Sequence, residues 1–167
     1  DTLTTSGFVG IGVPDELLAA IETRFLETGA PRDLSLVFAA GQGDGDKRGL
    51  NRLGHAGLLK RVVGGHWGLI PKVAALATAG KIEGWNLPQG CISQLFRDIA
   101  AGKPGMLSKV GLETFVDPRQ DGGRINEIST DDQVILMEVN GEEVLFYPAP
   151  RITVALLRGT TADEAGN

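Results

Sequence analysis

The first segment that could bind a charged group is the glycine-rich SGFVGIGVP, residues 6–14. This segment joins an apolar run to the start of a helical pattern, and backbone amides gathered at a helix start can hold negative charge. Its spacing does not match the dinucleotide fingerprint, because Asp15 stands where the third glycine should fall and, with Glu16, would repel a pyrophosphate. The segment therefore predicts a glycine turn that either lines a ligand site or is purely structural.

The segment GGHWG, residues 64–68, follows another apolar run. We expect His66 and Trp67 to project from the carboxyl edge of a sheet, where open α/β folds bind ligands. For His66, the alternative is a hydrogen-bonded structural role. Because His66, His55 and Cys91 do not have the spacing of metal ligands, we predict no metal site.

The segment LPQG, residues 87–90, places Gln89 at the start of a helix. The Gln89 amide could donate to a developing oxyanion, or it could cap the helix.

Arg119 could bind a carboxylate or phosphate through its planar fork, or it could hold Asp117 or a neighbouring loop. Cys91 is predicted to be a buried thiol and not a nucleophile, because the rest of its helix face is apolar.

The elements that must position these residues alternate between apolar runs and helical patterns. Strands are expected at residues 3–5, 34–39, 58–63 and 82–86, and helices at 14–27, 71–77 and 89–101. Such alternation requires crossover connections, and hence a mostly parallel sheet with helices on both faces. Residues 134–139 and 142–147 flank Asn140-Gly141, a strong signal for a hairpin, and a final strand at 152–157 is expected to return to the sheet. The predicted fold class is α/β with an antiparallel hairpin appended near the C-terminus.

The composition limits the classes of function. The chain has 167 residues, 42% hydrophobic and 22% charged, which fits one folded domain over residues 1–167. A formal net charge of -5 offers no surface for nucleic acid, and no apolar run approaches the roughly 18 residues that span a bilayer. The single cysteine excludes an intrachain disulfide and fits a reducing compartment. We therefore expect a cytoplasmic protein that binds neither nucleic acid nor membranes.

Five segments, in this order, resemble the acetate/propionate CoA-transferases and related 3-oxoacid CoA-transferases of family I. They are SGFVGIGVPDELL (residues 6–18), GGHWG (64–68), NLPQG (86–90), KPGMLSKVGLETFVDPRQDGG (103–123) and RGTTADEAGN (158–167). The resemblance covers essentially the whole chain, and GGHWG with TFVDPRQ points to the propionate CoA-transferase branch. It implies the CoA-transferase/NagB-like fold.

The resemblance implies transfer of coenzyme A between a short-chain acyl-CoA and a carboxylic acid such as acetate or propionate. The reaction would be ping-pong, through an acyl anhydride and a glutamyl-CoA thioester. Coenzyme A would be a substrate, with no permanently bound cofactor. Gln89, in the PQG segment, would form part of the oxyanion hole. The residues expected to bind substrate are Gly7, Phe8, Val9, Gly10, Gly65, His66, Trp67, Gly68 and Arg119.

The same resemblance places the nucleophilic glutamate outside this chain, in the second half of a complete polypeptide or in a partner subunit. We therefore expect an N-terminal half that is inactive without the glutamate-bearing half, in a homo-oligomeric enzyme. The chain begins without methionine and stops in a polar stretch, which suggests a fragment or a processed chain.

Two other interpretations remain. One is a small-molecule-binding or regulatory domain of the same fold without catalysis, which would be expected to show a Lys/Arg and Ser/Thr phosphate cluster. The other is a ribose-phosphate-type isomerase, which would need paired carboxylates or a lysine base. Asp44 and Asp46 are the nearest such pair, and we interpret them as a solvated acidic loop.

Overall fold

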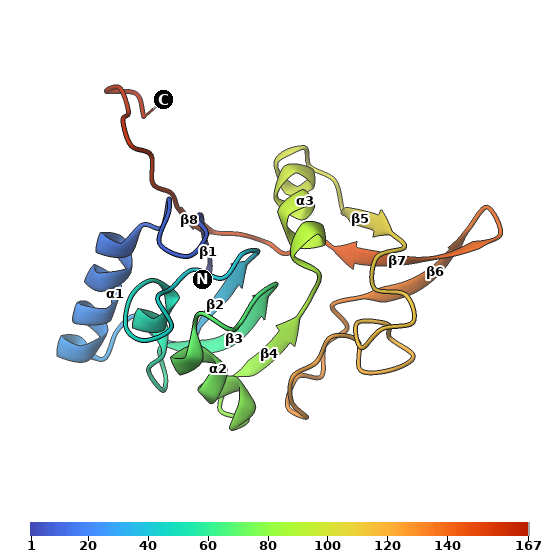
Figure 1. Ribbon diagram of the computed structural model, residues 1–167, viewed down its shortest axis with the longest axis horizontal. Coiled ribbons are helices and arrows are strands. Elements are labelled where there is room, and N and C mark those ends of the chain that lie inside the picture. Colours follow the sequence, from blue (N-terminus) through green and yellow to red (C-terminus); the bar gives the residue numbers. More distant parts are fainter. Residues whose placement is uncertain (167) are drawn as a thin grey trace.

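The computed structural model describes residues 1–166 and contains two sheets (Figure 1). The larger sheet has the strand order β4-β3-β2-β1-β8, and each neighbouring pair is parallel. Its strands are β1 (Thr2–Thr5), β2 (Leu34–Phe38), β3 (Leu59–Gly64), β4 (Glu83–Asn86) and β8 (Val154–Leu156). Because all five strands run the same way, their carboxyl ends meet at one edge.

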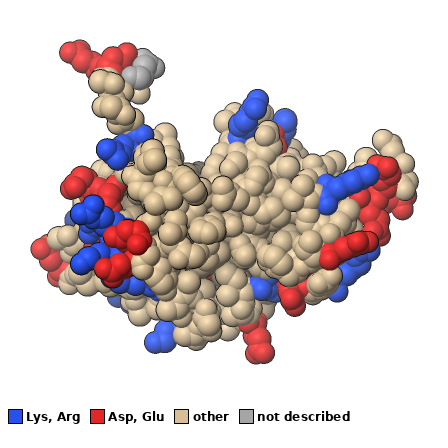
Figure 2. Space-filling model, in the orientation of Figure 1, with Lys and Arg blue, Asp and Glu red and all other residues tan. Residues whose placement is uncertain are grey.

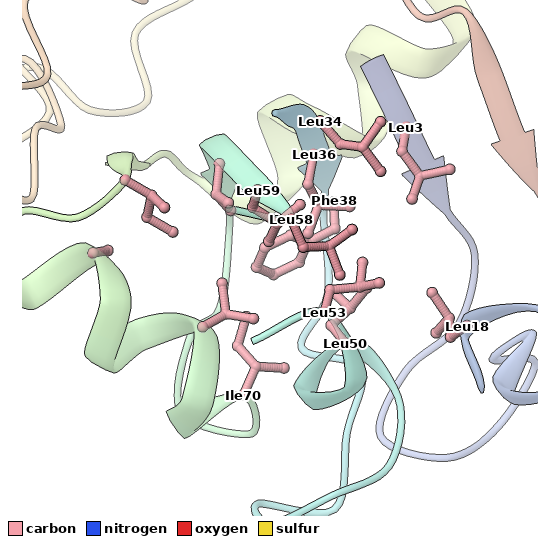
Figure 3. Close-up of a cluster of buried hydrophobic side chains, with 14 of the residues drawn as sticks. Leu3, Leu18, Leu34, Leu36, Phe38, Leu50, Leu53, Leu58, Leu59 and Ile70 are labelled. Atoms are coloured by element: carbon pink, nitrogen blue, oxygen red, sulfur yellow. The ribbon is translucent and has the colours of Figure 1, made fainter. Parts of the chain in front are cut away.

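Three helical elements pack on one face of this sheet: α1 (Asp15–Thr28), the 3-10 helix η1 (Leu50–Leu53) and α2 (Pro71–Thr78). Helix α1 follows Pro14 and is capped at its C-terminus by Gly29, whose φ of 71° suits a residue without a side chain. Figure 3 shows the core that they share, with Leu36 and Phe38 of β2 pointing toward Leu50 and Leu53. Alternate residues of β2, namely Leu34, Leu36 and Phe38, enter this core, as the two-residue period of a strand requires.

The opposite face is covered by α3 (Gln89–Ala100) and by the smaller sheet. Val37 and Val63 point to this side and join a second core with Ile92 and Leu95 of α3 and Tyr147 of the smaller sheet. The smaller sheet is antiparallel, in the order β5-β7-β6, and consists of β5 (Gly105–Ser108), β6 (Ile135–Val139) and β7 (Glu142–Pro148). It lies at the end of the molecule opposite α1 (Figure 1).

The structure confirms the predicted fold class. The expected strands and helices form within a few residues of their predicted bounds, helices cover both faces, and the final strand pairs in parallel with β1. The predicted hairpin forms around Asn140 and Gly141 with φ values of 53° and 79°. The hairpin is part of a three-stranded sheet, since β5 also pairs with β7. Neither β5 nor η1 was predicted from the sequence.

Cys91, in the first turn of α3, is buried, and burial raises the pKa of its thiol, which confirms the prediction of a buried thiol. Among residues 1–166, no helix is long and apolar enough to cross a membrane.

Figure 2 shows that the middle of one face carries mainly uncharged residues, whereas charged residues gather at its two ends.

Candidate functional site at the carboxyl edge of the parallel sheet

The loops that leave the carboxyl ends of β1 to β4 are tied to one another by backbone hydrogen bonds. Val9 N–H, in the loop after β1, donates to the Gly41 carbonyl in the loop after β2 over 2.8 Å. Gly65 N–H, after β3, donates to the Phe38 carbonyl over 3.2 Å, and Leu87 N–H, after β4, donates to the Gly64 carbonyl over 3.0 Å. The glycine segments predicted to carry chemistry therefore form one connected edge.

Gln89 begins α3 at this edge and is exposed. Its side-chain amide makes no hydrogen bond with any described residue, and neither do the backbone N–H groups of Gln89 and Gly90. The residue before the helix is Pro88, and no side chain caps it, so the interpretation of Gln89 as a helix cap finds no support. The start of α3 thus offers a neutral side-chain amide and free backbone amides to an oxyanion.

Gly65 allows the start of α3 to lie against the end of β3. A Cβ atom on Gly65 would come within 2.4 Å of the Ala39 carbonyl oxygen and 2.7 Å of the Gln89 Cα atom. Both obstacles are backbone or backbone-linked atoms, which cannot rotate away. The glycine at this position therefore places Gln89 at the edge.

The loop after β1 is a tight turn with exposed apolar side chains. Phe8 and Ile11 exchange two backbone hydrogen bonds of 3.0 and 2.9 Å, and Phe8 is 56% exposed. A Cβ atom on Gly7 would lie 2.6 Å from Val13, and Val9 itself has a positive φ of 56°. Such strain in a β-branched residue persists only where the surrounding structure holds it. Gly10 is open, with no atom within 4 Å of the position a Cβ would take.

The two large residues of GGHWG point in different directions. His66 is exposed and lies over Gly41, where a Cβ atom would come within 2.2 Å of its Nδ1 atom. Among residues 1–166 its ring has no hydrogen-bond partner. Trp67 instead packs into the first core, with its ring 5.9 Å from Phe38 in an edge-on arrangement and its Nε1–H donating to the Gly64 carbonyl. Gly68 is exposed beside His66.

A buried amide behind the glycine turn was missed from the sequence. Gln42 is 1% exposed and donates through Nε2 to the Thr5 carbonyl over 3.1 Å. Gln42 Oε1 and the neighbouring Thr5 Oγ1 are buried without a partner. Both residues line an open apolar cavity of about 610 Å³ between β1, β8 and α3, hereafter the apolar hollow. The position of Gln42 next to a glycine in a polar loop gave no signal of burial.

Arg119 lies in the segment between β5 and β6 and contacts the smaller sheet. Its guanidinium donates to Asp117 over 2.8 Å and to Glu143 of β7 over 3.0 Å. The interpretation that Arg119 holds Asp117 is thereby confirmed, and Arg119 keeps the pKa of Asp117 below its usual range. Among residues 1–166, Arg119 makes no hydrogen bond or ion pair with Gln89 or the glycine loops.

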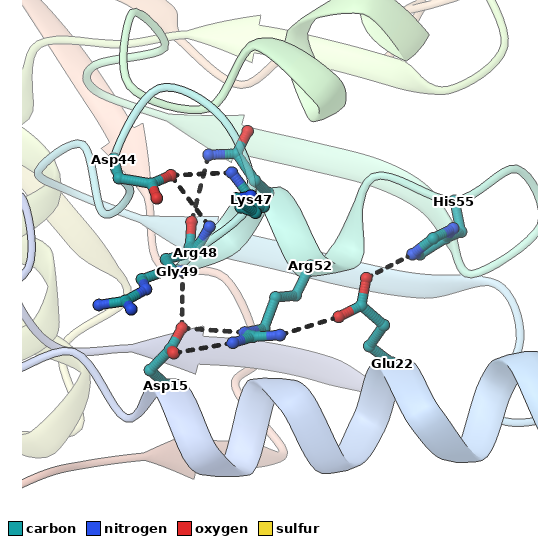
Figure 4. Close-up of polar contacts among 9 residues, drawn as sticks. Asp15, Glu22, Asp44, Lys47, Arg48, Gly49, Arg52 and His55 are labelled. Carbon is teal, nitrogen blue, oxygen red and sulfur yellow. Dashed lines mark hydrogen bonds and ion pairs between the residues drawn. The ribbon is translucent and has the colours of Figure 1, made fainter.

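An ion-pair network supports the loop after β2 (Figure 4). Arg52 binds Asp15 through Nε and Nη2, each at 3.0 Å, and binds Glu22 through Nη1 at 3.1 Å. Asp44 Oδ1 accepts backbone N–H groups from three residues at 2.8–3.0 Å, which lowers the pKa of Asp44 to about 2. The predicted acidic pair is indeed exposed, but Asp44 also shapes the loop. Among residues 1–166, no three His, Cys, Asp or Glu side chains gather as metal ligands would.

Together, these features describe an α/β domain of the open parallel type with neutral hydrogen-bond donors at its carboxyl edge, the edge at which such folds bind ligands. The profile of the coenzyme A transferase family matches residues 1–167. The chain belongs to the coenzyme A transferase family.

Individual relatives agree with this assignment. The chain is 46% identical to a caffeate CoA-transferase of Acetobacterium woodii, over 98% of the chain and 32% of the relative. It is 40% identical to the acetate CoA-transferase YdiF of Escherichia coli K12, over 94% of the chain and 30% of that protein. YdiF of Escherichia coli O157:H7, solved as the apoenzyme and as a thioester complex with CoA, superposes with a TM-score of 0.93 at 39% identity, over 96% of this chain and 32% of that one. The chain thus spans about a third of the length of these relatives.

Proposed function

We propose that the chain is the N-terminal domain, residues 1–167, of an enzyme that moves coenzyme A between a short-chain acyl-CoA and a carboxylic acid. The observation that carries this proposal is the exposed, unpaired Gln89 amide at the start of α3, next to free backbone N–H groups. These donors would stabilise the negative oxygen that forms when the acyl carbonyl is attacked. A neutral amide suits the task, because a fixed cation would also bind the ground-state carboxylate tightly.

In the proposed reaction, a glutamate outside this chain attacks the acyl-CoA carbonyl. The C–S bond breaks, CoA leaves as the thiolate, and an acyl anhydride remains on the enzyme. The thiolate then attacks the glutamyl carbonyl, which releases the first carboxylate and leaves a glutamyl-CoA thioester. The second acid repeats these two steps in reverse order, so no external reductant or oxidant is needed.

The proposed substrate-binding residues lie mainly on the two glycine loops. Phe8, Val9, Gly7 and Gly10 would border the acyl group from the loop after β1, and His66 would border it from the loop after β3 with Gly65 and Gly68. Trp67 would act from behind the loop, through its contact with Phe38. The exposed Phe8 side chain supports an apolar contact in this region.

The proposed substrates follow from the names of the relatives. Acetate and propionate are the first acids to test, and caffeate should be tested beside them, because a caffeate CoA-transferase is among the similar proteins. The proposed partner is the glutamate-bearing remainder of the enzyme, either on the same polypeptide or in a second subunit. We propose that the enzyme is a homo-oligomer. We also propose a cytoplasmic location, in keeping with a buried thiol as the single cysteine.

Replacing Gln89 tests the oxyanion role. In the enzyme assembled with its glutamate-bearing part, Gln89→Ala should lower kcat by about 10²- to 10³-fold, the usual effect of losing one oxyanion donor. Gln94→Ala is the matched control, because Gln94 is an exposed glutamine of the same helix. Equal rates for the two variants would remove Gln89 from the site.

Trapping the covalent intermediate tests the location of the nucleophile. Incubation with acetyl-CoA and hydroxylamine, followed by peptide mass analysis, should modify a glutamate outside residues 1–167. A modified glutamate within that range would contradict the proposed division of the active site.

A further inference from the structure

A second cavity opens at the carboxyl edge, beside the glycine turn after β1. It has a volume of about 280 Å³ and is bordered by three different parts of the chain: the turn after β1 with the start of α1, the loop after β2, and the segment after β8. Its lining residues are Val9, Gly10, Val13, Asp15, Gly43, Asp44, Arg48, Gly49 and Arg158. Two arginines from distant parts of the sequence therefore meet at one small cavity.

Arg48 and Arg158 are two of the six arginines that make no ion pair within residues 1–166. Arg52, Arg61, Arg119 and Arg124 each hold a carboxylate at 3.1 Å or less. Neither Arg48 nor Arg158 has a carboxylate within ion-pair distance in the part of the chain that the structure describes, residues 1–166. Figure 4 shows the Arg48 side chain extending away from the network of Asp44 and Arg52, with no interaction drawn to its guanidinium.

The two carboxylates of the lining are already bound by other groups. Asp15 accepts two hydrogen bonds from Arg52 and one from the Gly49 N–H at 2.8 Å, and the Arg52 hydrogen bonds lower the pKa of Asp15. Asp44 Oδ1 is filled by three backbone N–H groups. Arg52 therefore offsets most of the repulsion that Asp15 would exert on an anion. Arg48 also attracts Asp15 electrostatically, but the N–H donors of Arg48 and Arg158 are not used in hydrogen bonds within residues 1–166.

We propose that Arg48 and Arg158 form an oxyanion-binding subsite that holds a phosphate or carboxylate group of a substrate next to the glycine turn. Guanidinium groups bind such oxyanions through paired, charge-assisted hydrogen bonds. Gly10 forms an open part of the wall, because no atom lies within 4 Å of the position that a Cβ would take there. The assignment of that group to a substrate rests on the proposed function. Two sources fit the chemistry: a phosphate of coenzyme A and the carboxylate of the acceptor acid.

The test is calorimetric binding to the chain with and without Arg48→Gln, Arg158→Gln and both substitutions together. Arg97→Gln serves as the matched control, because Arg97 is exposed on α3, makes no ion pair with residues 1–166 and borders none of the cavities described above. The probes are coenzyme A, 3′-dephospho-coenzyme A, pantetheine, acetate and inorganic phosphate. Pantetheine lacks phosphate and carboxylate groups, and acetate lacks phosphate, so the probes distinguish the two sources.

We expect each single substitution to weaken binding of coenzyme A or acetate by about 10- to 100-fold, the usual effect of losing a hydrogen bond to a charged group. Binding should also weaken with rising salt, and Arg97→Gln should change it by less than about threefold. A loss seen with coenzyme A but not acetate assigns the subsite to a phosphate, and the reverse assigns it to the acid. Unchanged affinity of both arginine variants for every probe, or no binding of any oxyanion to the unsubstituted chain, would overturn the proposal.

This outcome is separable from that of the proposed function. In the assembled enzyme, the arginine variants should raise the KM of the substrate concerned by a similar factor and leave kcat within about threefold, because uniform binding is lost. If oxyanions bind through Arg48 and Arg158 but Gln89→Ala leaves transfer unchanged, the subsite stands and the oxyanion role of Gln89 fails.

Discussion

At the scale of single residues, the candidate site depends on glycines that let other residues approach closely, as well as on its functional side chains. Gly65 lets α3 begin against β3, and Gly41 leaves room for the His66 ring. In the proposed oxyanion role, the amide of Gln89 depends on the close approach at Gly65 for its position. Glycine is needed here for space, since neither residue has a positive φ.

Substituting Gly65 tests this positioning role. Gly65→Ala would drive a methyl group to 2.4 Å from the Ala39 carbonyl oxygen and 2.7 Å from the Gln89 Cα atom. We expect a loss of about 3 kcal/mol in the free energy of unfolding, at the upper end for overpacking, together with lower transfer activity in the assembled enzyme. Urea unfolding measures the first effect.

Gly90→Ala is the control for this experiment, because nothing lies within 4 Å of the added methyl group and alanine favours a helix. It should change stability by less than about 1 kcal/mol, in the stabilising direction. If both variants unfold alike, the close contact at Gly65 does not constrain the site.

Gln89 and the glycine loops could be predicted from the sequence because each is a local signal: a glutamine after Pro88 at a helix start, or glycines after an apolar run. Gln42, Arg48 and Arg158 could not. Gln42 becomes buried only when the loop after β2 folds back onto β1. Arg48 and Arg158 meet only because β8 pairs with β1, which carries the end of the chain to the same edge.

At the scale of elements, the predictions succeeded where a segment's own residues decide its conformation. In the large sheet, β2 and β8 are short, mostly apolar runs, and the helices begin at or just after proline residues. The β5 strand was missed because its four residues do not alternate; pairing with the distant β7 makes it a strand. The signal for η1 was present in Leu50 and Leu53, both fully buried, but a polar glycine loop surrounds them.

The hairpin between β6 and β7 can be tested by changing its turn. Gly141 has a φ of 79° and open space around the position of a Cβ atom, so only its backbone conformation restricts substitution. Gly141→Ala should reduce stability by about 1–2 kcal/mol, the cost of a left-handed conformation for an ordinary residue. Gly141→Asn should cost less, because asparagine tolerates that conformation.

Thermal unfolding of the two variants measures the difference, and a shift of roughly 2–4 °C per kcal/mol is expected for a chain of this size. Equal midpoints for Gly141→Ala and Gly141→Asn would mean that the turn does not hold the hairpin in the conformation described here.

At the scale of the whole molecule, the two faces of the large sheet are covered unequally. One face carries α1, η1 and α2, while the other carries α3 and the smaller sheet at one end. The apolar hollow of about 610 Å³ lies on the second face, between α3 and the strands β1 and β8. Its walls are largely apolar, and two buried polar atoms, Thr5 Oγ1 and Gln42 Oε1, have no partner there. Each such atom costs on the order of 1–3 kcal/mol if it is left unsatisfied.

Under the proposed function, this chain is one part of an enzyme like its relatives, which are about three times as long, and we expect the other part to cover the apolar hollow. Ser93 borders the hollow from α3 and is exposed, so a Ser93→Cys thiol should react readily with a small maleimide in the folded chain. In the enzyme assembled with the remaining polypeptide, the same thiol should react at least about tenfold more slowly, because a packed segment excludes the reagent. The native Cys91 thiol, 2% exposed and with a raised pKa, should react in neither sample until the protein unfolds. Gln94→Cys, on the same helix but outside the hollow, should react equally in both.

Equal labelling of Ser93→Cys in the two samples would show that this face stays open to solvent in the complete enzyme.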